Sequence, residues 1–316
     1  MLLKNITEDK LRNIAQQLLR QVNQEEDVLT VEAFIDEELD KTYNTYLLTS
    51  SYNNKFIMKK SDNLQEKQVY KYAFTNDKFN VPIYYGDIEQ NTEDSMEIYM
   101  LLQYIEGEDL RKATLKQLRN AVIELAKIHR HFLETRLEVK VEYDFDRKLS
   151  NILKRDEKAL SKKESLMFNK FYRVYQMYVE RCKQAPKTLI NDDLLPINIL
   201  ANETSSTIID WGYAHISPYM LDIARLVCHE YEKDKFFIPQ EFHKELEELY
   251  YQEMCKSSKF NVSYEQYLVD IKLAKFQERS YWIIWKIRED EELEEDPEKD
   301  FNLKACVELA NEIIPD

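Results

Sequence analysis

The stretch 189–212 constrains the fold of this chain most, because it combines strand-like apolar runs with closely spaced polar groups. Two short runs, Leu-Ile and Ile-Ile, each lead within three residues into a carboxylate, first Asp193 and then Asp210. Asn198 follows Asp193 by five residues, and the polar sequence TSST separates the two halves. Short apolar runs bounded by turn-forming residues are typical of buried strands. The pattern predicts a strand pair between Asn198 and Asp210.

The spacing D-x-x-x-x-N followed by D-x-G suits phosphoryl transfer. In kinases an Asp lies near the attacking hydroxyl, while an Asn and a second Asp bind Mg²⁺. This chemistry predicts that Asp193 is the catalytic residue. It also predicts that Asn198 and Asp210 are the metal ligands.

The sequence LINDDLLPINIL, taken with IIDWGY, resembles the catalytic and metal-binding segments of the aminoglycoside phosphotransferase and choline kinase superfamily. These are small-molecule kinases with a protein-kinase-like fold. The resemblance implies an α+β, two-lobed protein-kinase-like fold, with a small antiparallel-sheet N-lobe (1–102) and a larger, mainly helical C-lobe (103–316). It also implies ATP (or GTP) between the lobes, together with Mg²⁺. The family has a His two residues before the catalytic Asp; this chain has Asn191, whose amide could support the loop instead.

Composition limits the partners. The net charge is −15, from 44 basic and 59 acidic residues, which disfavours a nucleic-acid partner because such binding depends on contacts with phosphates. The charge is compatible with a cationic substrate, although a solvated acidic surface is the commoner explanation. No apolar run approaches the ~18 residues of a membrane span, and the N-terminus lacks the pattern of a signal peptide. Four scattered cysteines indicate reduced thiols and a cytoplasmic location.

The chain has only three glycines, at positions 86, 107 and 212. A glycine-rich phosphate loop of the Walker or protein-kinase type is therefore excluded. The polar connection 36–44 occupies the place of the phosphate-covering loop. Without glycine its backbone cannot approach phosphates closely, so we expect side chains such as Thr42 and Asn44 to make the contacts.

The sequence of the N-terminal third predicts two helices and five strands. Apolar residues recur at helical spacing over 7–22, with Thr7 as its N-cap. The expected strands share β-branched and aromatic residues between turn signals, and lie at 28–35, 45–50, 55–59, 81–86 and 98–104. A helix at 62–74 follows the third strand.

Two nucleotide contacts follow from the resemblance. Lys59 ends the third strand as the nucleotide-binding lysine of kinases does, and Glu66 on the next helix is its expected partner. If the register of the strand is shifted by one residue, Lys60 takes the place of Lys59 as the nucleotide-binding lysine. Considered without the other motifs, Lys59 could also be a solvated lysine at the end of a strand. MLLQYIEGEDL resembles the interlobe hinge, where the Gln103 carbonyl and the Ile105 amide would face adenine.

The C-terminal part is expected to be helical and to carry the acceptor site. Within the helix predicted at 265–290, one stripe holds Glu278, Trp282, Trp285 and Glu289, which could attract a cation through ring faces and charge. Packing of both Trp side chains into the core is the alternative. Nine acidic residues in 289–300 suggest either a solvated loop or a polyamine-like substrate.

Supporting roles are expected for three other polar residues. The resemblance implies that Asp222, on a helix after Gly212, holds the catalytic loop by hydrogen bonds, alongside Asn191. His129 lies on the apolar face of the helix predicted at 114–132, where a core role is expected. The sequence therefore predicts an ATP-dependent O-phosphotransferase acting on a small cationic alcohol. An aminoglycoside-like acceptor is preferred to choline or ethanolamine, and a silent nucleotide-binding pseudokinase is the alternative of another class.

Overall fold

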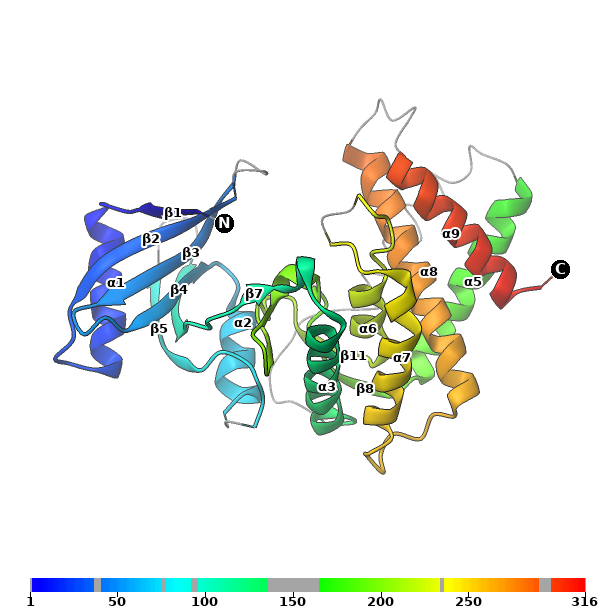
Figure 1. Ribbon diagram of the computed structural model, residues 1–316, viewed down its shortest axis with the longest axis horizontal. Coiled ribbons are helices and arrows are strands. Elements are labelled where there is room, and N and C mark those ends of the chain that lie inside the picture. Colours follow the sequence, from blue (N-terminus) through cyan, green and yellow to red (C-terminus); the bar gives the residue numbers. More distant parts are fainter. Residues whose placement is uncertain are drawn as a thin grey trace. The chain divides into compact units, whose positions relative to one another are not determined.

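The computed structural model describes residues 2–36, 41–75, 78–91, 96–135, 165–233, 236–289 and 297–315 (Figure 1). The chain forms two compact units. Unit 1 comprises Met1–Glu108 and Thr207–Gly212, and unit 2 comprises Asp109–Ser206 and Tyr213–Asp316. The predicted boundary at 102/103 lies close to the first change of unit, but the return of 207–212 to unit 1 was not predicted.

Unit 1 is built on a six-stranded antiparallel sheet with the order β1-β2-β3-β4-β6-β5. Its strands are β1 (Leu2–Asn5), β2 (Val28–Asp36), β3 (Lys41–Ser50), β4 (Lys55–Ser61), β5 (Tyr84–Asn91) and β6 (Met96–Gln103). The prediction of five strands missed β1, because its four residues are all exposed and carry no buried alternation.

The predicted connection at 36–44 was wrong over its second half. Strand β3 begins at Lys41, so Thr42 and Asn44 lie within the strand, and Thr42 pairs with Ile35 of β2. Both side chains are exposed. Alternation of Thr and Tyr with polar residues is compatible with a solvated strand, which sequence reasoning took for a loop.

Helix α1 (Asp9–Val22) packs against the sheet through its apolar stripe (Figure 1). Ile14, Leu18 and Leu19 are fully buried beside Leu48 and Met58. Each such side chain contributes about 2 kcal/mol through burial. The predicted Thr7 cap was wrong: Glu8 occupies the N-cap position, and its side chain makes no capping hydrogen bond.

After β4 the chain forms α2 (Leu64–Gln68), which continues into a π-helical turn, Val69–Ala73. The Asn63 side chain caps α2 by accepting a hydrogen bond from the Gln65 N–H at 2.8 Å. Short π-helical turns occur often near functional sites. Here the turn buries the side chains of Val69 and Tyr70.

Unit 2 is mainly helical. Its helices are α3 (Leu115–Phe132), α5 (Ser165–Gln184), α6 (Met220–Val227), α7 (Gln240–Met254), α8 (Tyr264–Glu289) and α9 (Pro297–Ile313). Short strands accompany them, namely β8 (Lys187–Ile190), β9 (Ile199–Ala201) and β11 (His215–Pro218), with 3₁₀ turns at Leu110–Lys112 and Pro196–Asn198. Two more short strands, β7 (Glu108–Asp109) and β10 (Ser206–Ile208), lie where the chain passes from one unit to the other. Strand β8 pairs with β11, while α8 packs against α9, α6 and α5.

The abundance of Tyr and Phe among polar residues over 149–182 also predicts a helix. The structure describes it from Ser165 onward as α5, and its earlier part lies outside the described residues. Thr114 is the N-cap residue of helix α3, and its capping box with Gln117 fixes the start of the helix at Leu115. The predicted core role of His129 is confirmed: the ring is fully buried, 2.6 Å from the Tyr250 hydroxyl and 3.2 Å from Asp222.

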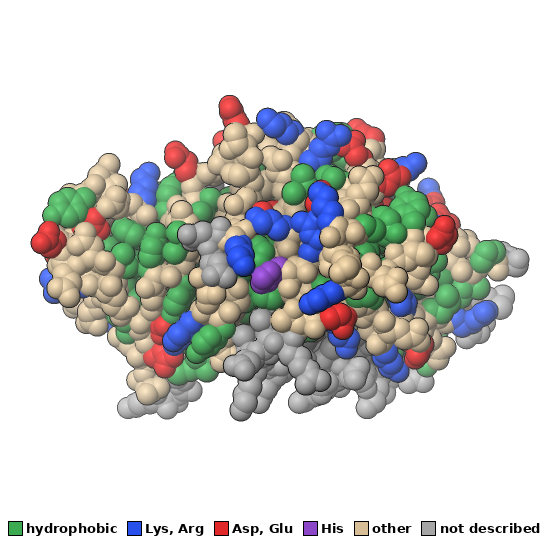
Figure 2. Space-filling model, turned by 90° about the horizontal axis from the view of Figure 1, so that it is seen from below, with side chains coloured by type: hydrophobic (Ala, Val, Ile, Leu, Met, Phe, Trp, Pro, Cys, Tyr) green, Lys and Arg blue, Asp and Glu red, His purple; other side chains and the backbone are tan. Residues whose placement is uncertain are grey.

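Both charge signs occur across the face in Figure 2, so the excess of acidic residues does not form one continuous patch there. Within the described ranges, no helix is both long and apolar enough to cross a bilayer. All four cysteines are free thiols, as expected.

Candidate active site

Unit 1 brings Lys59, Glu66 and Asp210 together. The Lys59 ammonium nitrogen lies 2.8 Å from Oε1 of Glu66 and 2.8 Å from Oδ1 of Asp210. Burial alone would lower the pKa of Lys59, but the two carboxylates outweigh it and the pKa is raised. Burial raises the pKa of Glu66, although the Lys59 charge opposes this. Lys59 is therefore a fixed cation between two acidic groups.

The register of β4 selects Lys59 and rejects Lys60. Successive side chains of a strand point to opposite faces. Lys60 instead forms an ion pair with Glu97 at 2.6 Å and lies over the Tyr99 ring. The alternative lysine is thus on the other side of the sheet, next to α1.

Asp210 reaches Lys59 because the segment 207–212 is anchored in unit 1. The Trp211 ring is fully buried, packs edge-on against Phe74 at 4.7 Å, and donates its indole N–H to the Ile208 carbonyl at 3.2 Å. At the end of the segment, the Asn63 amide donates to the Gly212 carbonyl at 3.1 Å.

Asp210 itself has a left-handed backbone with φ of 56°. Residues other than glycine rarely adopt this conformation, and such strain of order 1–3 kcal/mol is most often found at functional sites. The Tyr70 hydroxyl forms a hydrogen bond with the Asp210 backbone, and 40% of the Asp210 side chain is exposed. The carboxylate is thus fixed in place yet accessible.

In unit 2, Asp222 holds the catalytic loop, the segment 191–195 that follows β8 and carries Asp193. This fully buried carboxylate accepts hydrogen bonds from two successive backbone amides, Asn191 N–H at 2.7 Å and Asp192 N–H at 3.0 Å. The Asn191 side-chain oxygen accepts from the Asp193 N–H at 3.1 Å. These hydrogen bonds hold Asp192 in the left-handed conformation, with φ of 60°, which residues other than glycine rarely adopt.

Asn198 lies beside Asp193. Its side-chain nitrogen donates to the Asp193 carbonyl at 2.7 Å and to Oδ2 of Asp193 at 3.1 Å. Both contacts use the amide nitrogen, so the carbonyl oxygen of Asn198 is the atom that a cation would use. The predicted strand pair is present as β9 and β10. In the turn between these strands, the Asn202 N–H donates to the Ser205 carbonyl at 3.0 Å.

Arg225 is a site residue that sequence reasoning missed. Its guanidinium donates to Oδ1 of Asp193 at 2.6 Å and to Oε2 of Glu278 at 2.9 Å. One signal could have found it: Arg225 is the only cation in α6, whose residues are otherwise apolar apart from Asp222. A charged side chain on a buried helix almost always has a partner.

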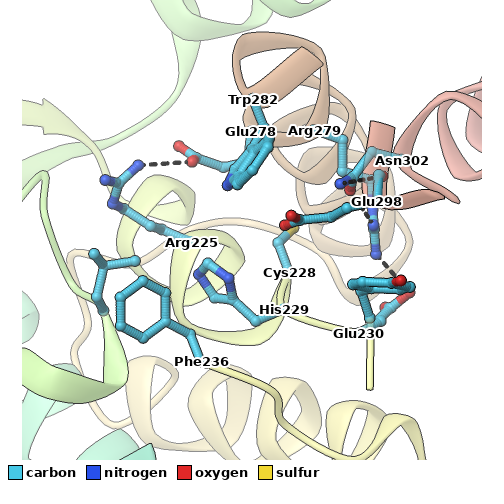
Figure 3. A pocket seen from close by; sticks show the side chains of 12 residues that line it. Arg225, Cys228, His229, Glu230, Phe236, Glu278, Arg279, Trp282, Glu298 and Asn302 are labelled. Atoms are coloured by element: carbon cyan, nitrogen blue, oxygen red, sulfur yellow. Dashed lines mark hydrogen bonds and ion pairs between the residues drawn. The ribbon is translucent and has the colours of Figure 1, made fainter. Parts of the chain in front are cut away.

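A pocket adjoins this arginine in unit 2 (Figure 3). Its walls combine aromatic rings with charged groups, and are formed by Leu195, Arg225, Cys228, His229, Glu230, Tyr231, Phe236, Glu278, Arg279, Trp282, Glu298 and Asn302. Glu278 and Trp282 thus lie together, as their spacing predicts. The side chains of Trp285 and Glu289 lie outside the described residues, as does 290–296 of the acidic run.

Comparison with known proteins decides the family. The model of the phosphotransferase enzyme family matches residues 43–253. The chain belongs to this family. No curated protein matches the sequence.

Solved structures support the same conclusion about the fold. Choline kinase LicA from Streptococcus pneumoniae is 15% identical, with a TM-score of 0.59 over 96% of this chain and 100% of that one. A GDP complex of an aminoglycoside 2'-phosphotransferase-IIIa mutant is 14% identical, with a TM-score of 0.60 over 96% and 99%. Plasmodium vivax ethanolamine kinase is 14% identical, with a TM-score of 0.53 over 88% and 82%. The predicted kinase-like fold is confirmed, and the chain is a kinase-type phosphotransferase.

The expected magnesium ligands of this phosphotransferase remain predictions. No cluster of three or more His, Cys, Asp or Glu side chains suited to a metal is found among the described residues. Nucleotide-bound Mg²⁺ needs few protein ligands, because phosphates and water supply most of the six oxygens. Asn198 in unit 2 and Asp210 in unit 1 each carry an oxygen of the kind that Mg²⁺ prefers.

The expected adenine contacts of this phosphotransferase remain predictions. Gln103 ends β6, and its side-chain oxygen accepts a hydrogen bond from the Ile83 N–H at 3.3 Å. Ile105 follows in an irregular segment and is partly exposed. Backbone contacts of this kind do not depend on side-chain identity, so the sequence carries little signal for them.

Proposed function

We propose that the protein transfers the γ-phosphate of ATP (or GTP) to a hydroxyl of a small molecule, with Asp193 as the catalytic residue. The observation that carries this proposal is the triad of Lys59, Glu66 and Asp210, in which the lysine lies between one buried and one accessible carboxylate. Phosphoryl transfer depends on fixed charges around the phosphates, and the two ion pairs hold the ammonium group of Lys59 in place.

Each group of the triad has a distinct role in the proposed reaction. Lys59 contacts the α- and β-phosphates and offsets their charge, while Glu66 keeps its ammonium group in place. Asp210 and Asn198 would hold Mg²⁺, which when bound would neutralise charge on the phosphates. Gln103 and Ile105 contact the base through their backbones, and Thr42 and Asn44 remain candidates for contacts near the phosphates.

Asp193 orients the acceptor hydroxyl and takes its proton as the oxygen attacks the γ-phosphorus. The bond from phosphorus to the bridging oxygen breaks, and the nucleoside diphosphate leaves. Because the transition state is loose, positioning supplies most of the acceleration. Asp222 and Asn191 supply that positioning, since they fix the backbone on both sides of Asp192. An amide at position 191 therefore supports the loop in place of the family His, which favours an active enzyme over a pseudokinase.

The pocket in unit 2 indicates the class of acceptor. The pocket has three described carboxylates, Glu230, Glu278 and Glu298. Two of them are compensated by arginines: Glu278 by Arg225 at 2.9 Å, and Glu230 by Arg279 at 2.5 Å. A polyamine needs several uncompensated carboxylates, whereas one cationic centre needs mainly ring faces such as those of Trp282 and Phe236. We therefore propose a small alcohol with one cationic group, such as choline or ethanolamine. An aminoglycoside is the second candidate, favoured by the acidic run 289–300.

A direct test combines variants with an acceptor screen. Purified protein with Mg·ATP is assayed for transfer to choline, ethanolamine and a panel of aminoglycosides. Asp193→Ala and Asp210→Ala should abolish transfer while leaving the thermal transition in place. Lys60→Ala is the matched control for Lys59→Ala, and only the latter should impair turnover. Full turnover by the Asp193 variant would refute the assignment. Stabilisation by Mg·ATP without transfer to any acceptor would favour the pseudokinase.

A further inference from the structure

Arg225 joins the catalytic loop to the acceptor pocket. One terminal nitrogen of its guanidinium donates to Asp193 and the other to Glu278, at 2.6 and 2.9 Å (Figure 3 shows the second contact). The two carboxylates belong to different elements, the loop after β8 and helix α8. A planar guanidinium can hold two such partners at once with fixed geometry.

Asp193 is held from both sides as a result. Arg225 binds its Oδ1, and the Asn198 amide binds its Oδ2 at 3.1 Å. Two donors on opposite oxygens fix the rotation of the carboxylate about its side-chain bonds. An acceptor hydroxyl would therefore meet a carboxylate that is already oriented.

Glu278 in turn fixes Arg225. Burial by itself would lower the pKa of Arg225, but Glu278 and Asp193 outweigh it and the pKa is raised. Burial raises the pKa of Glu278, and the Arg225 charge opposes that rise. Each charge thus depends on the other, since removal of one partner leaves a buried charge uncompensated.

We propose that Arg225 is a positioning residue of the reaction, which aims Asp193 at the acceptor and is itself held by Glu278 from the pocket wall. The inference rests on the proposed function. An acceptor that contacts Glu278 would change the position of the Arg225 guanidinium, and with it the orientation of the Asp193 carboxylate. Glu278 therefore influences turnover through Arg225, in addition to any direct contact with the acceptor.

Arg225→Lys and Glu278→Gln test this inference with Mg·ATP and the best acceptor of the screen. A lysine keeps the charge but cannot hold two carboxylates in a fork. We expect kcat to fall about tenfold or more in Arg225→Lys and roughly threefold or more in Glu278→Gln, with KM for ATP within about twofold. In the double variant, kcat should match that of Arg225→Lys alone, because the two side chains act as one unit.

The matched control lies in the helical core. Arg181 also holds a carboxylate through two nitrogens, at 2.6 and 2.8 Å from the two oxygens of Asp270. Arg181→Lys should lower the thermal transition and keep kcat within about twofold. If Arg225 were merely structural, Arg225→Lys would behave in the same way.

The outcomes separate the two hypotheses. Wild-type kcat in Arg225→Lys, equal losses of kcat in Arg225→Lys and Arg181→Lys, or multiplicative effects in the double variant would each overturn the positioning role. Should Arg225→Lys fail to fold, wild-type kcat in Glu278→Gln would overturn it instead. If Asp193→Ala still turns over, the proposed function fails. If Asp193→Ala is inactive and Arg225→Lys is fully active, only the present inference fails.

Discussion

Oε1 of Glu66 lies 2.8 Å from the Lys59 ammonium nitrogen, and only 2% of the Glu66 side chain is exposed. In the proposed reaction, Glu66 therefore supports the nucleotide-binding lysine without contacting the nucleotide itself. The carboxylate is enclosed by α2 and the segment around Trp211, whose backbone forms a hydrogen bond with it. Its effect on ligands must therefore pass through Lys59.

Glu66→Gln should weaken Mg·ATP binding. With a neutral partner, Lys59 would be drawn further toward Asp210 and away from the phosphates. We expect Kd to rise about tenfold, which corresponds to about 1.4 kcal/mol. Isothermal titration calorimetry measures this change. Glu97→Gln, which removes the partner of Lys60 on the other face of β4, is the control and should leave Kd unchanged. Equal Kd values for Glu66→Gln and the wild type would contradict the role of Glu66.

Asp222→Asn should disorder the catalytic loop more than it destabilises the fold. An amide offers one accepting oxygen, so one of the N–H groups of Asn191 and Asp192 would lose its partner. The cost should be roughly 1–3 kcal/mol in the free energy of unfolding. We expect kcat to fall at least about tenfold.

Asp270→Asn provides the matched control for that loss. Asp270 is equally buried and accepts hydrogen bonds from Arg181 and the Tyr219 hydroxyl, which belong to the helical core. Urea unfolding should show a comparable loss of stability, while kcat per folded molecule stays near that of the wild type. A similar fall in kcat for both variants would show that Asp222 acts only through stability.

The stability of unit 2 should depend on Glu230 in acid. Burial alone would raise its pKa, but His243 and Arg279 outweigh it and lower the pKa from 4.5 to about 2. A lowered pKa in the folded state gives stability that is complete above the unfolded value of 4.5 and is lost as the pH falls toward about 2. Thermal unfolding between these limits should show a weaker pH dependence in Glu230→Gln. An unchanged slope would refute the contribution of Glu230.

Thiol labelling should distinguish the four cysteines. Burial raises the pKa of Cys182 and of Cys228 to about 12, and that of Cys306 to about 11. Cys255 is exposed at the end of α7. Because the thiolate is the reactive form, iodoacetamide at pH 8 should modify Cys255 first. Peptide mapping by mass spectrometry identifies the modified residue. Early modification of Cys228 would indicate that the pocket wall opens in solution.

Local sequence was a good guide wherever one residue pattern fixes one element. The stripe of α1, the helix after Thr114 and the place of Lys59 in β4 were all predicted, because their signals lie within a few residues. Strands whose side chains are exposed were harder to predict from the sequence. Strand β1 and the first residues of β3 are exposed, so they carry no apolar alternation, and Thr42 and Asn44 were assigned to a loop.

The sequence by itself determined the chemistry: two aspartates, an asparagine and a lysine at kinase-like spacing, on a chain with too little glycine for a phosphate loop. Only the tertiary structure decided the partners. It chose Lys59 over Lys60 through the strand register, placed Asp210 beside that lysine through the buried Trp211, and coupled Asp193 to Glu278 through Arg225. Spacing along the chain specifies which groups are available, but contacts between distant segments depend on packing and charge compensation, which act only once the chain has folded.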